Sequence, residues 1–332
     1  LIKNAEAIEK AGKVTHILLD KTGTLTEGRP KVTAVFEAPG QDKERLLSMV
    51  ASLEQASEHP LARAIVGFAK EQNSKIELVK DFVSVTGEGV KGNIDGKIVA
   101  AGKQKFIAGL GISTPEGLIK QAINLQNQAQ AVVWVAFEDK VSGVIGISDP
   151  IKETTLGAIK ALHAMGLKII MLTGDNRLTA EVVSGRLGLD GFQAELEPGS
   201  KQEIVRKFQN EGAVVMMAGD GINDAPALAE AEVGLAMGTG TDVAIESAAI
   251  TLVKGDLSGI VKVLRLSRHV MKNIRQNLFF AFIYNLLGVP VAAGILYPFF
   301  GLLLSPVIAG AAMSFSSVSV IGNSLRLSKS KL

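Results

Sequence analysis

The sequence predicts an α/β protein whose parallel sheet carries an inserted second domain and is followed by a two-helix membrane hairpin. Two observations support this fold class. Apolar runs of strand length alternate with helical patterns over much of the chain, which is typical of a parallel sheet. In addition, no charged residue falls between Asn277 and Leu325. All 35 basic and 33 acidic residues therefore lie in the remaining sequence, which has an ordinary globular composition.

Five apolar runs are predicted to be the strands of the parallel sheet, because buried parallel strands are almost continuously apolar. They are residues 14–19, 167–172, 213–218, 233–237 and 250–253. Helical patterns lie between several of these runs, at 153–165, 178–187 and 201–209. The alternation predicts parallel strands that are connected by helices.

More than a hundred residues between the first and second strands do not follow this alternation and predict an inserted α+β domain. They contain two helical stretches at 43–55 and 61–73, then turn-rich strands, and return through 132–137 and 141–147. The Asp149-Pro150 step leads back into the first domain, so two adjacent connections would form a hinge. The predicted division is a stalk segment at 1–12, the first domain at 13–29 and 148–262, the insert at 30–147, a stalk helix at 263–277, membrane helices at 278–297 and 299–322, and a tail at 323–332.

The uncharged stretch has the length of two bilayer spans of about 20 residues each, joined by a turn at Pro298. Lysine and arginine flank both ends of it, at Lys272 and Arg275 before and at Arg326 after. By the positive-inside rule, both hairpin ends and both globular domains are cytoplasmic, as in an integral protein of the plasma (inner) membrane. The chain begins at Leu1 without methionine and in mid-pattern, which suggests a piece of a longer protein.

Composition excludes several classes of protein. The chain has no cysteine, so a disulfide scaffold, a thiolate metal site and a cysteine nucleophile are excluded within these residues. The formal net charge of +2 argues against nucleic acid as a partner.

Polar residues follow three of the predicted strands at the point where each strand ends. They are Asp20 to Thr24, Thr173-Gly174-Asp175, and Gly219-Asp220-Gly221 with Asn223 and Asp224. Ligands of open parallel sheets bind at the carboxyl ends of the strands, and clustered carboxylates select a hard cation such as Mg²⁺. A carboxylate beside that ion could attack phosphorus, with Lys201 offsetting the charge of the transferred group. Any one of these acids could instead be only a turn former or a helix cap.

The motif Asp-Lys-Thr-Gly-Thr-Leu-Thr at 20–26, with Thr-Gly-Asp at 173–175 and Gly-Asp-Gly-Ile-Asn-Asp-Ala-Pro at 219–226, resembles the phosphorylation domain of the P-type ATPases. The resemblance implies a haloacid-dehalogenase-like fold in which Asp20 accepts the γ-phosphate of ATP. It also implies roles for further residues. Mg²⁺ would be held by Asp20, the Thr22 carbonyl and Asp220. The phosphoryl group would be contacted by Thr173 and Lys201, and the site would be supported by Asn223 and Asp224. The nucleotide side would have Gly174 and Asp175, and the hinge side Asp149.

The insert resembles the nucleotide domain of the heavy-metal P-type ATPases, through Ser57-Glu58-His59-Pro60-Leu61. That resemblance implies that Glu58, His59, Gly87 and Gly89 bind ATP. Where this family usually has Gly-Asn, the chain has Gly102-Lys103, so one nucleotide contact differs. Read without the family, His59 before a proline could simply begin a helix.

Two further motifs in the insert are not expected to have their usual meaning. Residues 87–92 match the dinucleotide pattern Gly-x-Gly-x-x-Gly, but residues 93–97 behind them predict a hairpin turn and not a helix. Thr86-Gly87-Glu88 imitates a dephosphorylating loop that, in the P-type ATPases, precedes the phosphorylated aspartate.

Four polar or soft side chains lie at a common depth in the predicted hairpin: Tyr284, Asn285, Met313 and Ser317. Together they resemble the last two helices of copper(I)-transporting ATPases, and a thioether is a soft ligand suited to copper(I). Small and soft residues of spanning helices can also serve only for packing. The resemblance implies copper(I), or silver, as the transported ion, and ATP and Mg²⁺ as cofactors. The remaining partners would be membrane lipid and the missing N-terminal part of the protein, with its actuator domain and other membrane helices.

Two other functions stay open on the sequence alone. The same sheet could carry a membrane-anchored haloacid-dehalogenase-like phosphatase without transport, since one fold supports several chemistries. A non-catalytic ATP-binding regulator is the third hypothesis.

Overall fold

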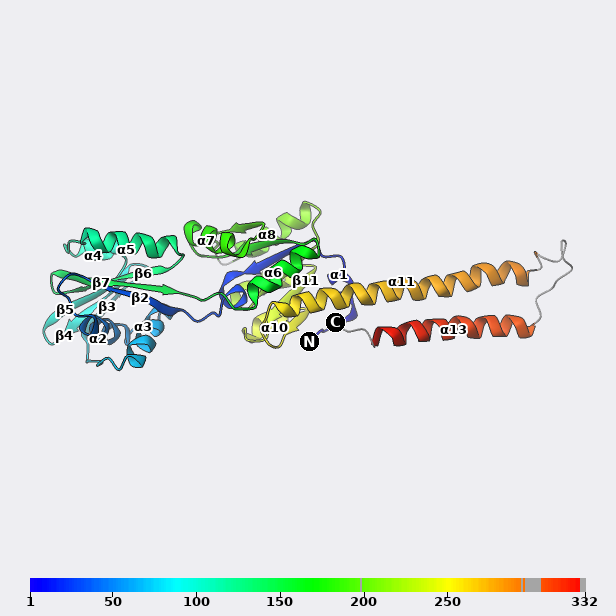
Figure 1. Ribbon diagram of the computed structural model, residues 1–332, viewed down its shortest axis with the longest axis horizontal. Helices are drawn as coiled ribbons and strands as arrows, with labels where there is room; N and C mark the ends of the chain where they lie inside the picture. Colours follow the sequence, from blue (N-terminus) through cyan, green and yellow to red (C-terminus); the bar gives the residue numbers. More distant parts are fainter. Residues whose placement is uncertain (198, 294, 296–305, 329–332) are drawn as a thin grey trace.

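Two six-stranded sheets of different kinds organise the chain (Figure 1). The computed structural model describes residues 1–197, 199–293, 295 and 306–328. The first sheet has the order β12-β11-β10-β1-β8-β9 and is parallel throughout. The second has the order β2-β7-β6-β5-β4-β3 and is antiparallel throughout. The expected combination of a parallel sheet with an α+β insert is confirmed.

The strands of the first sheet are β1 (His16–Asp20), β8 (Lys168–Leu172), β9 (Gly191–Gln193), β10 (Val215–Gly219), β11 (Val233–Met237) and β12 (Ile250–Leu252). The five predicted strands are confirmed, with ends that differ by two residues at most. Strand β9 was not predicted, because its residues, Gly-Phe-Gln, include only one large apolar side chain and so give no apolar run.

Helices cover both faces of the first sheet, and this explains why the inner residues of its longer strands are apolar on both sides. Helices α1 (Ala5–Ala11), α6 (Thr155–Ala164), α7 (Arg177–Leu187) and the first turns of α11 (Ser258–Ala292) pack on one face. Helices α8 (Ser200–Asn210), α9 (Ala225–Glu230) and α10 (Asp242–Ser247) pack on the other. The predicted helices at 153–165, 178–187 and 201–209 correspond to α6, α7 and α8.

The second sheet consists of β2 (Lys31–Glu37), β3 (Lys80–Val85), β4 (Gly89–Ile94), β5 (Lys97–Gly102), β6 (Ala131–Phe137) and β7 (Lys140–Ser148). Helices α2 (Lys43–Glu54) and α3 (Pro60–Glu71) cover one face, and α4 (Gln104–Gly109) and α5 (Glu116–Asn127) the other. The hairpin turn predicted behind residues 87–92 joins β4 to β5, with Asp95 and Gly96 at positive φ. No helix follows the Gly-x-Gly-x-x-Gly pattern, so the dinucleotide interpretation is excluded.

Two neighbouring segments connect the sheets. One leaves β1 through the turn η1 (Lys21–Leu25), and the other returns from β7 through Asp149. They are joined by a bridge between Thr26 and Ile151. The Asp149 carboxylate strengthens the junction by accepting from the Thr26 hydroxyl at 2.5 Å and from the Arg29 N–H at 3.1 Å. Asp149 thus lies at the junction of the two segments, and its role in a hinge stays a prediction.

Helix α11 continues from the first sheet as one helix of 35 residues, and α13 (Pro306–Ser328) lies alongside its outer half (Figure 1). The expected division at residue 277 between a stalk helix and a membrane helix is therefore not a structural break. A cluster of amides joins the two helices. The Asn273 side chain donates to Asn323 O at 2.8 Å, the Asn323 side chain donates to Asn277 Oδ1 at 2.8 Å, and the Asn277 side chain donates to Ser324 Oγ at 2.9 Å.

Among the residues that the structure describes, no helix combines the length and the apolar character that a membrane span requires. The spans predicted at 278–297 and 299–322 are therefore not confirmed. Residues 294 and 296–305, which belong to these predicted spans, lie outside the described part. Large apolar side chains on the outer part of the two helices are more than half exposed: Leu278, Phe279, Phe282, Leu286, Leu287, Val289, Phe315, Val318, Ile321 and Leu325.

Candidate functional site

The carboxyl ends of three adjacent strands, β10, β1 and β8, bring the predicted acids to one edge of the first sheet. Asp20 is the last residue of β1, Asp220 follows β10, and Thr173 follows β8. One carboxylate oxygen from each of Asp20, Asp220 and Asp224 lies within 4.8 Å of the others. Residues that are about 200 positions apart in the sequence therefore form a single cluster, because parallel strands end at the same edge.

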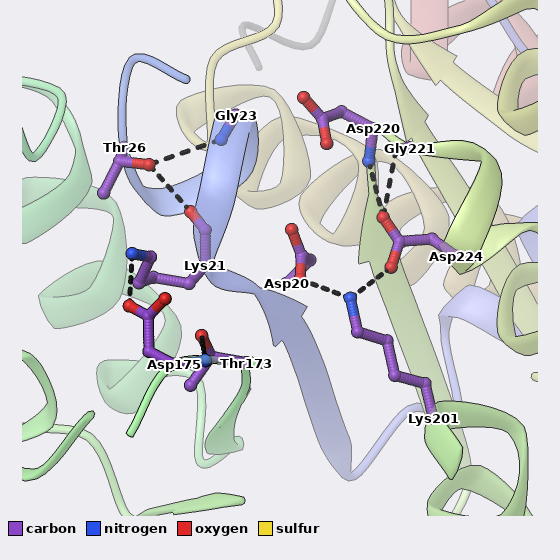
Figure 2. Close-up of polar contacts among 10 residues, drawn as sticks. All are labelled: Asp20, Lys21, Gly23, Thr26, Thr173, Asp175, Lys201, Asp220, Gly221 and Asp224. Carbon is purple, nitrogen blue, oxygen red and sulfur yellow. Dashed lines mark hydrogen bonds and ion pairs between the residues drawn. The ribbon is translucent and has the colours of Figure 1, made fainter. Parts of the chain in front are cut away.

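Lys201 lies between two of these carboxylates, as Figure 2 shows. Its ammonium is 2.5 Å from Asp20 Oδ1 and 2.6 Å from Asp224 Oδ1. Helix α8 positions Lys201 because its N-terminal turn begins beside this edge. The second oxygen of Asp224 accepts the N–H groups of Asp220 at 3.2 Å and Gly221 at 3.0 Å, so Asp224 also holds the β10 loop in place.

Burial strongly affects the charges of the cluster. The Asp20 side chain is nearly inaccessible to solvent, and burial together with the Asp224 carboxylate raises the pKa of Asp20 to about 7, although Lys201 opposes the rise. Burial and Asp224 also raise the pKa of Asp220. Burial alone would lower the pKa of Lys201, but the Asp20 and Asp224 carboxylates raise it above its ordinary value. The ammonium therefore stays charged.

The donor set fits a magnesium ion. Three carboxylates converge, and within the described ranges Lys201 is the cation that forms ion pairs with two of them, Asp20 and Asp224. One ammonium leaves a surplus of negative charge when all three acids are ionised. Hard carboxylate oxygens are the ligands that Mg²⁺ prefers.

Gly23 permits the tight approach of the Asp20 loop to Asp220. Its φ is +72°, and a Cβ atom at this position would lie 1.6 Å from Asp220 Oδ2. A side chain is therefore excluded both by the backbone conformation and by space. The sequence motif contains this glycine, but only the structure shows that the glycine contacts the carboxylate of another strand.

The remaining predicted residues of the first sheet surround this cluster. Asp175 forms an ion pair with Lys21 at 2.5 Å, and the Asp175 N–H donates to Thr173 Oγ1 at 3.0 Å (Figure 2). Thr22 and Gly174 are exposed, as is Asn223 in the short turn η2 (Ile222–Asp224). The Lys21–Asp175 pair was not predicted from the sequence, since nothing local indicates a contact over 154 positions.

The residues expected to bind nucleotide lie in the insert, in two loops. Glu58 and His59 precede α3 and are exposed, and the His59 ring accepts the Leu61 N–H at 3.2 Å. This is the helix-start role considered for His59. Gly87 lies in the β3–β4 turn, and Gly89 pairs with Gly102. In the part of the chain that the structure describes, no hydrogen bond or ion pair joins these loops to one another or to the Asp20 cluster.

A buried acid near these loops was missed in the sequence. Glu54, at the end of α2, is 8% exposed, and burial raises its pKa to about 7, while the Ser57 hydroxyl opposes the rise. Glu54 lines a cavity of about 270 Å³ between α2 and α3, together with Ser57, Arg63 and Lys70. The signal that could have revealed Glu54 is its position on the apolar face of the helical pattern at 43–55.

The predicted copper ligands are only partly described. Tyr284 and Asn285 lie on α11 and Met313 lies on α13, but their side chains are outside the described part of the structure. Ser317 is on α13 and is exposed.

Comparisons with known proteins agree with this geometry. Residues 14–232 match the family model of haloacid dehalogenase-like hydrolases. A copper-transporting P-type ATPase of Rhizobium leguminosarum bv. viciae is 55% identical over an alignment of 334 positions that covers 100% of this chain and 39% of the relative. A silver exporting P-type ATPase of Salmonella typhimurium is 51% identical over 332 residues, which are 100% of this chain and 40% of the relative. The chain thus spans less than half the length of these relatives.

Solved structures show the same similarity. A zinc-transporting PIB-type ATPase in the E2.Pi state superimposes with a TM-score of 0.82 at 37% identity, over 98% of this chain and 52% of that one. The catalytic domain of the CPx-ATPase CopB-B gives a TM-score of 0.63 at 34% identity, over 80% of this chain and 94% of that one.

Proposed function

The chain belongs to the haloacid dehalogenase-like hydrolases and, among them, to the heavy-metal P-type ATPases, and we propose that it is the C-terminal part of a copper(I)-exporting pump. In this proposal, ATP phosphorylates Asp20, and the phosphorylated state drives efflux of the metal. The single observation that carries the chemistry is the convergence of Asp20, Asp220 and Asp224 around Lys201 at the strand ends.

Asp20 is the proposed nucleophile. One of its carboxylate oxygens attacks the γ-phosphorus of ATP, the bond from that phosphorus to the bridging oxygen breaks, and ADP leaves. The attacking carboxylate must be ionised, and burial opposes this by raising the pKa of Asp20 to about 7. Lys201 favours the ionised form and afterwards neutralises charge on the transferred phosphoryl group. Thr173 at the end of β8 is the proposed second phosphoryl contact.

Asp20, the Thr22 carbonyl and Asp220 are the proposed holders of Mg²⁺. When bound, the ion would neutralise negative charge on the phosphate oxygens. Asp224 and Asn223 support the site from the turn after β10, where Asp224 already fixes two backbone N–H groups. Gly174 and Asp175, on the loop after β8, are the proposed nucleotide-side groups.

ATP is proposed to bind through the insert, by Glu58, His59, Gly87 and Gly89. Gly89 lets the backbone of β4 lie close to that of β5, because a Cβ atom at Gly89 would be 2.5 Å from Ala101 O. The hinge at Asp149 would let the insert deliver the γ-phosphate to Asp20. Lys103 takes the place where the family usually has asparagine, and it precedes the first turn of α4.

Copper(I) is the proposed cargo, with silver as the related alternative. The relatives described above are named for copper and silver, although one similar solved structure transports zinc. Tyr284, Asn285, Met313 and Ser317 are the proposed ligands, in which the Met313 thioether suits a soft monovalent ion. The exposed apolar side chains on α11 and α13 support lipid contact. The proposed location is the plasma (inner) membrane, and the basic residues that flank the uncharged stretch favour the cytoplasmic side for both globular parts.

Phosphorylation is tested on the full-length protein with ATP labelled at the γ-phosphate. We expect an acid-stable, hydroxylamine-sensitive phosphoenzyme in the wild type and none in Asp20→Asn. Asp139→Asn, an exposed aspartate in the β6–β7 turn, is the matched control and should label normally. Labelling that persists in Asp20→Asn would refute the assignment.

Metal specificity is tested by ATP hydrolysis of the full-length protein with copper(I), silver(I) or zinc(II). Stimulation by the monovalent ions is expected, and Met313→Leu should reduce it by about ten-fold, because the soft ligand is lost. Stimulation by zinc without stimulation by copper would contradict the proposed cargo.

A further inference from the structure

Lys152 lies in the segment by which the chain returns from the second sheet to the first. Its backbone N–H donates to Leu25 O at 3.1 Å, and the Thr155 hydroxyl donates to the same carbonyl at 3.0 Å. Leu25 ends the turn that begins directly after Asp20. The backbone around Lys152 is therefore already attached to the far end of the Asp20 loop.

The Lys152 side chain holds two backbone carbonyls. Its ammonium donates to Gly23 O and, at 2.9 Å, to Gly255 O. Within the described residues, it forms no ion pair with a carboxylate. Burial lowers the pKa of Lys152, and nearby carboxylates oppose this effect: Asp220, Asp256, Asp149 and Glu27. The positive charge of Lys152 thus lies near Asp220, but the hydrogen bonds of Lys152 go to neutral carbonyls. Lys152 therefore does not occupy the carboxylate oxygens of Asp220.

The two carbonyls belong to different parts of the chain, the Asp20 loop and the turn before α11. Gly23 is in the Asp20 loop and packs against the Asp220 carboxylate. Gly255 is in the turn between β12 and α11, where its φ is +59° and its N–H donates to Leu252 O at 2.8 Å. Directly after it, Asp256 Oδ1 accepts the Ser258 N–H at 2.8 Å, at the first residue of α11.

We propose that Lys152 is a positioning residue that ties the Asp20 loop to the start of α11. A shift of either carbonyl by about 1 Å would lengthen one of its two hydrogen bonds beyond the useful range. The loop geometry at Asp20 and the orientation of α11 are therefore coupled through one ammonium. This inference rests on the proposed phosphorylation of Asp20, and it adds a residue that holds the loop without contacting the reacting atoms.

The test uses the full-length protein and three variants. Lys152→Met keeps the length of the side chain and removes the donor, whereas Lys152→Arg keeps a charged donor that can reach two carbonyls. Lys160→Met is the matched control, because Lys160 is exposed on the helix that follows. The maximal rate of phosphoenzyme formation and the ATP concentration at half-maximal rate are measured, together with deuterium uptake at 21–25 and 255–259.

We expect Lys152→Met to lower the maximal rate by about ten- to hundred-fold, since small misplacement of a reacting group costs that much. The half-maximal ATP concentration should change by less than about two-fold, because the hydrogen bonds of Lys152 go to none of the residues that are proposed to bind ATP. Lys152→Arg should recover most of the rate, and Lys160→Met should match the wild type. Deuterium uptake should rise in both segments of Lys152→Met.

Other results would overturn the inference. An unchanged maximal rate in Lys152→Met would do so while leaving the phosphorylation of Asp20 intact. A lower rate with no recovery in Lys152→Arg, and with uptake raised throughout the chain, would mean that Lys152 only stabilises the fold. If the wild type itself forms no phosphoenzyme, the proposed function fails and the inference fails with it.

Discussion

At the scale of single residues, burial and the charge of Lys201 have opposite effects on the ionisation of the acids in the site. Asp20, Asp220 and Asp224 lie within 4.8 Å of one another, and Lys201 bonds to two of them. Burial disfavours the ionised acids, and the ammonium favours them. Under the proposed function, a divalent cation would neutralise the negative charge that remains when all three acids are ionised.

Gly23→Ala should abolish phosphoenzyme formation by displacing Asp220. The new methyl group would collide with Asp220 Oδ2, and the φ of +72° adds a strain of about 1 kcal/mol. Gly40→Ala is the matched control, because Gly40 has a φ of +78° with open space around it. Gly40→Ala should lose only the strain energy, measured by thermal unfolding, and label normally. Normal labelling in Gly23→Ala would contradict the role of this close approach.

The Mg²⁺ requirement should depend on pH through Asp20. Below about pH 7 the buried Asp20 carboxyl is protonated, so a proton competes with the ion, and above this pH the carboxylate is free. The Mg²⁺ concentration for half-maximal labelling should therefore fall as the pH rises from about 6 to 8. Lys201→Met removes the group that lowers the pKa of Asp20, so the same fall should move to higher pH. Identical pH profiles of the wild type and Lys201→Met would refute this.

At the scale of elements, the strands and the helices have different consequences for function. Parallel strands β10, β1 and β8 bring acids together only because their ends coincide, as the register of β1 with both neighbours shows. Helix α11 is anchored to the helices that cover the first sheet. The Ser267 hydroxyl donates to Ile8 O in α1, and Arg268 donates to Met165 O at the end of α6 at 3.0 Å. The inner half of α11 is therefore fixed to the first sheet and its covering helices.

The amide cluster on α11 and α13 should fix the register of the two helices. The double variant Asn277→Cys, Asn323→Cys tests this register. A short bifunctional maleimide should cross-link its two cysteines efficiently. The native side chains are bonded at 2.8 Å, and the chain has no other cysteine to interfere. The control pair, Asn277→Cys with Phe315→Cys, should react poorly because its members lie about two helical turns apart in level. Equal yields, measured by peptide mass spectrometry, would contradict the observed register.

At the scale of the whole molecule, two globular parts lie at one end and two long helices extend from the other (Figure 1). The inner half of α11 is packed on the first sheet, whereas its outer half and α13 expose large apolar side chains. Lipid is the solvent that suits such a surface, since exposed apolar area in water is unfavourable.

Removal of residues 278–325 should release the chain from membranes. The shortened chain keeps the first sheet, the insert and the part of α11 that packs on the first sheet, so it should stay folded. We expect the intact chain to remain in the membrane pellet after an alkaline wash and the shortened chain to appear in the supernatant. Circular dichroism and thermal unfolding of the shortened chain provide the control for folding. Complete release of the intact chain would contradict membrane insertion.

The sequence by itself determined five of the six strands of the first sheet, the place of the insert and the acids at the strand ends. These features are local, because apolar periodicity and strand-end motifs depend on neighbouring residues. The tertiary structure decided which distant groups meet: Gly23 against Asp220, Lys21 with Asp175, and Lys152 between Gly23 and Gly255. It also decided that Glu54 is buried and that α11 continues without a break at residue 277. Such contacts depend on packing between elements far apart in the chain, which no local pattern specifies.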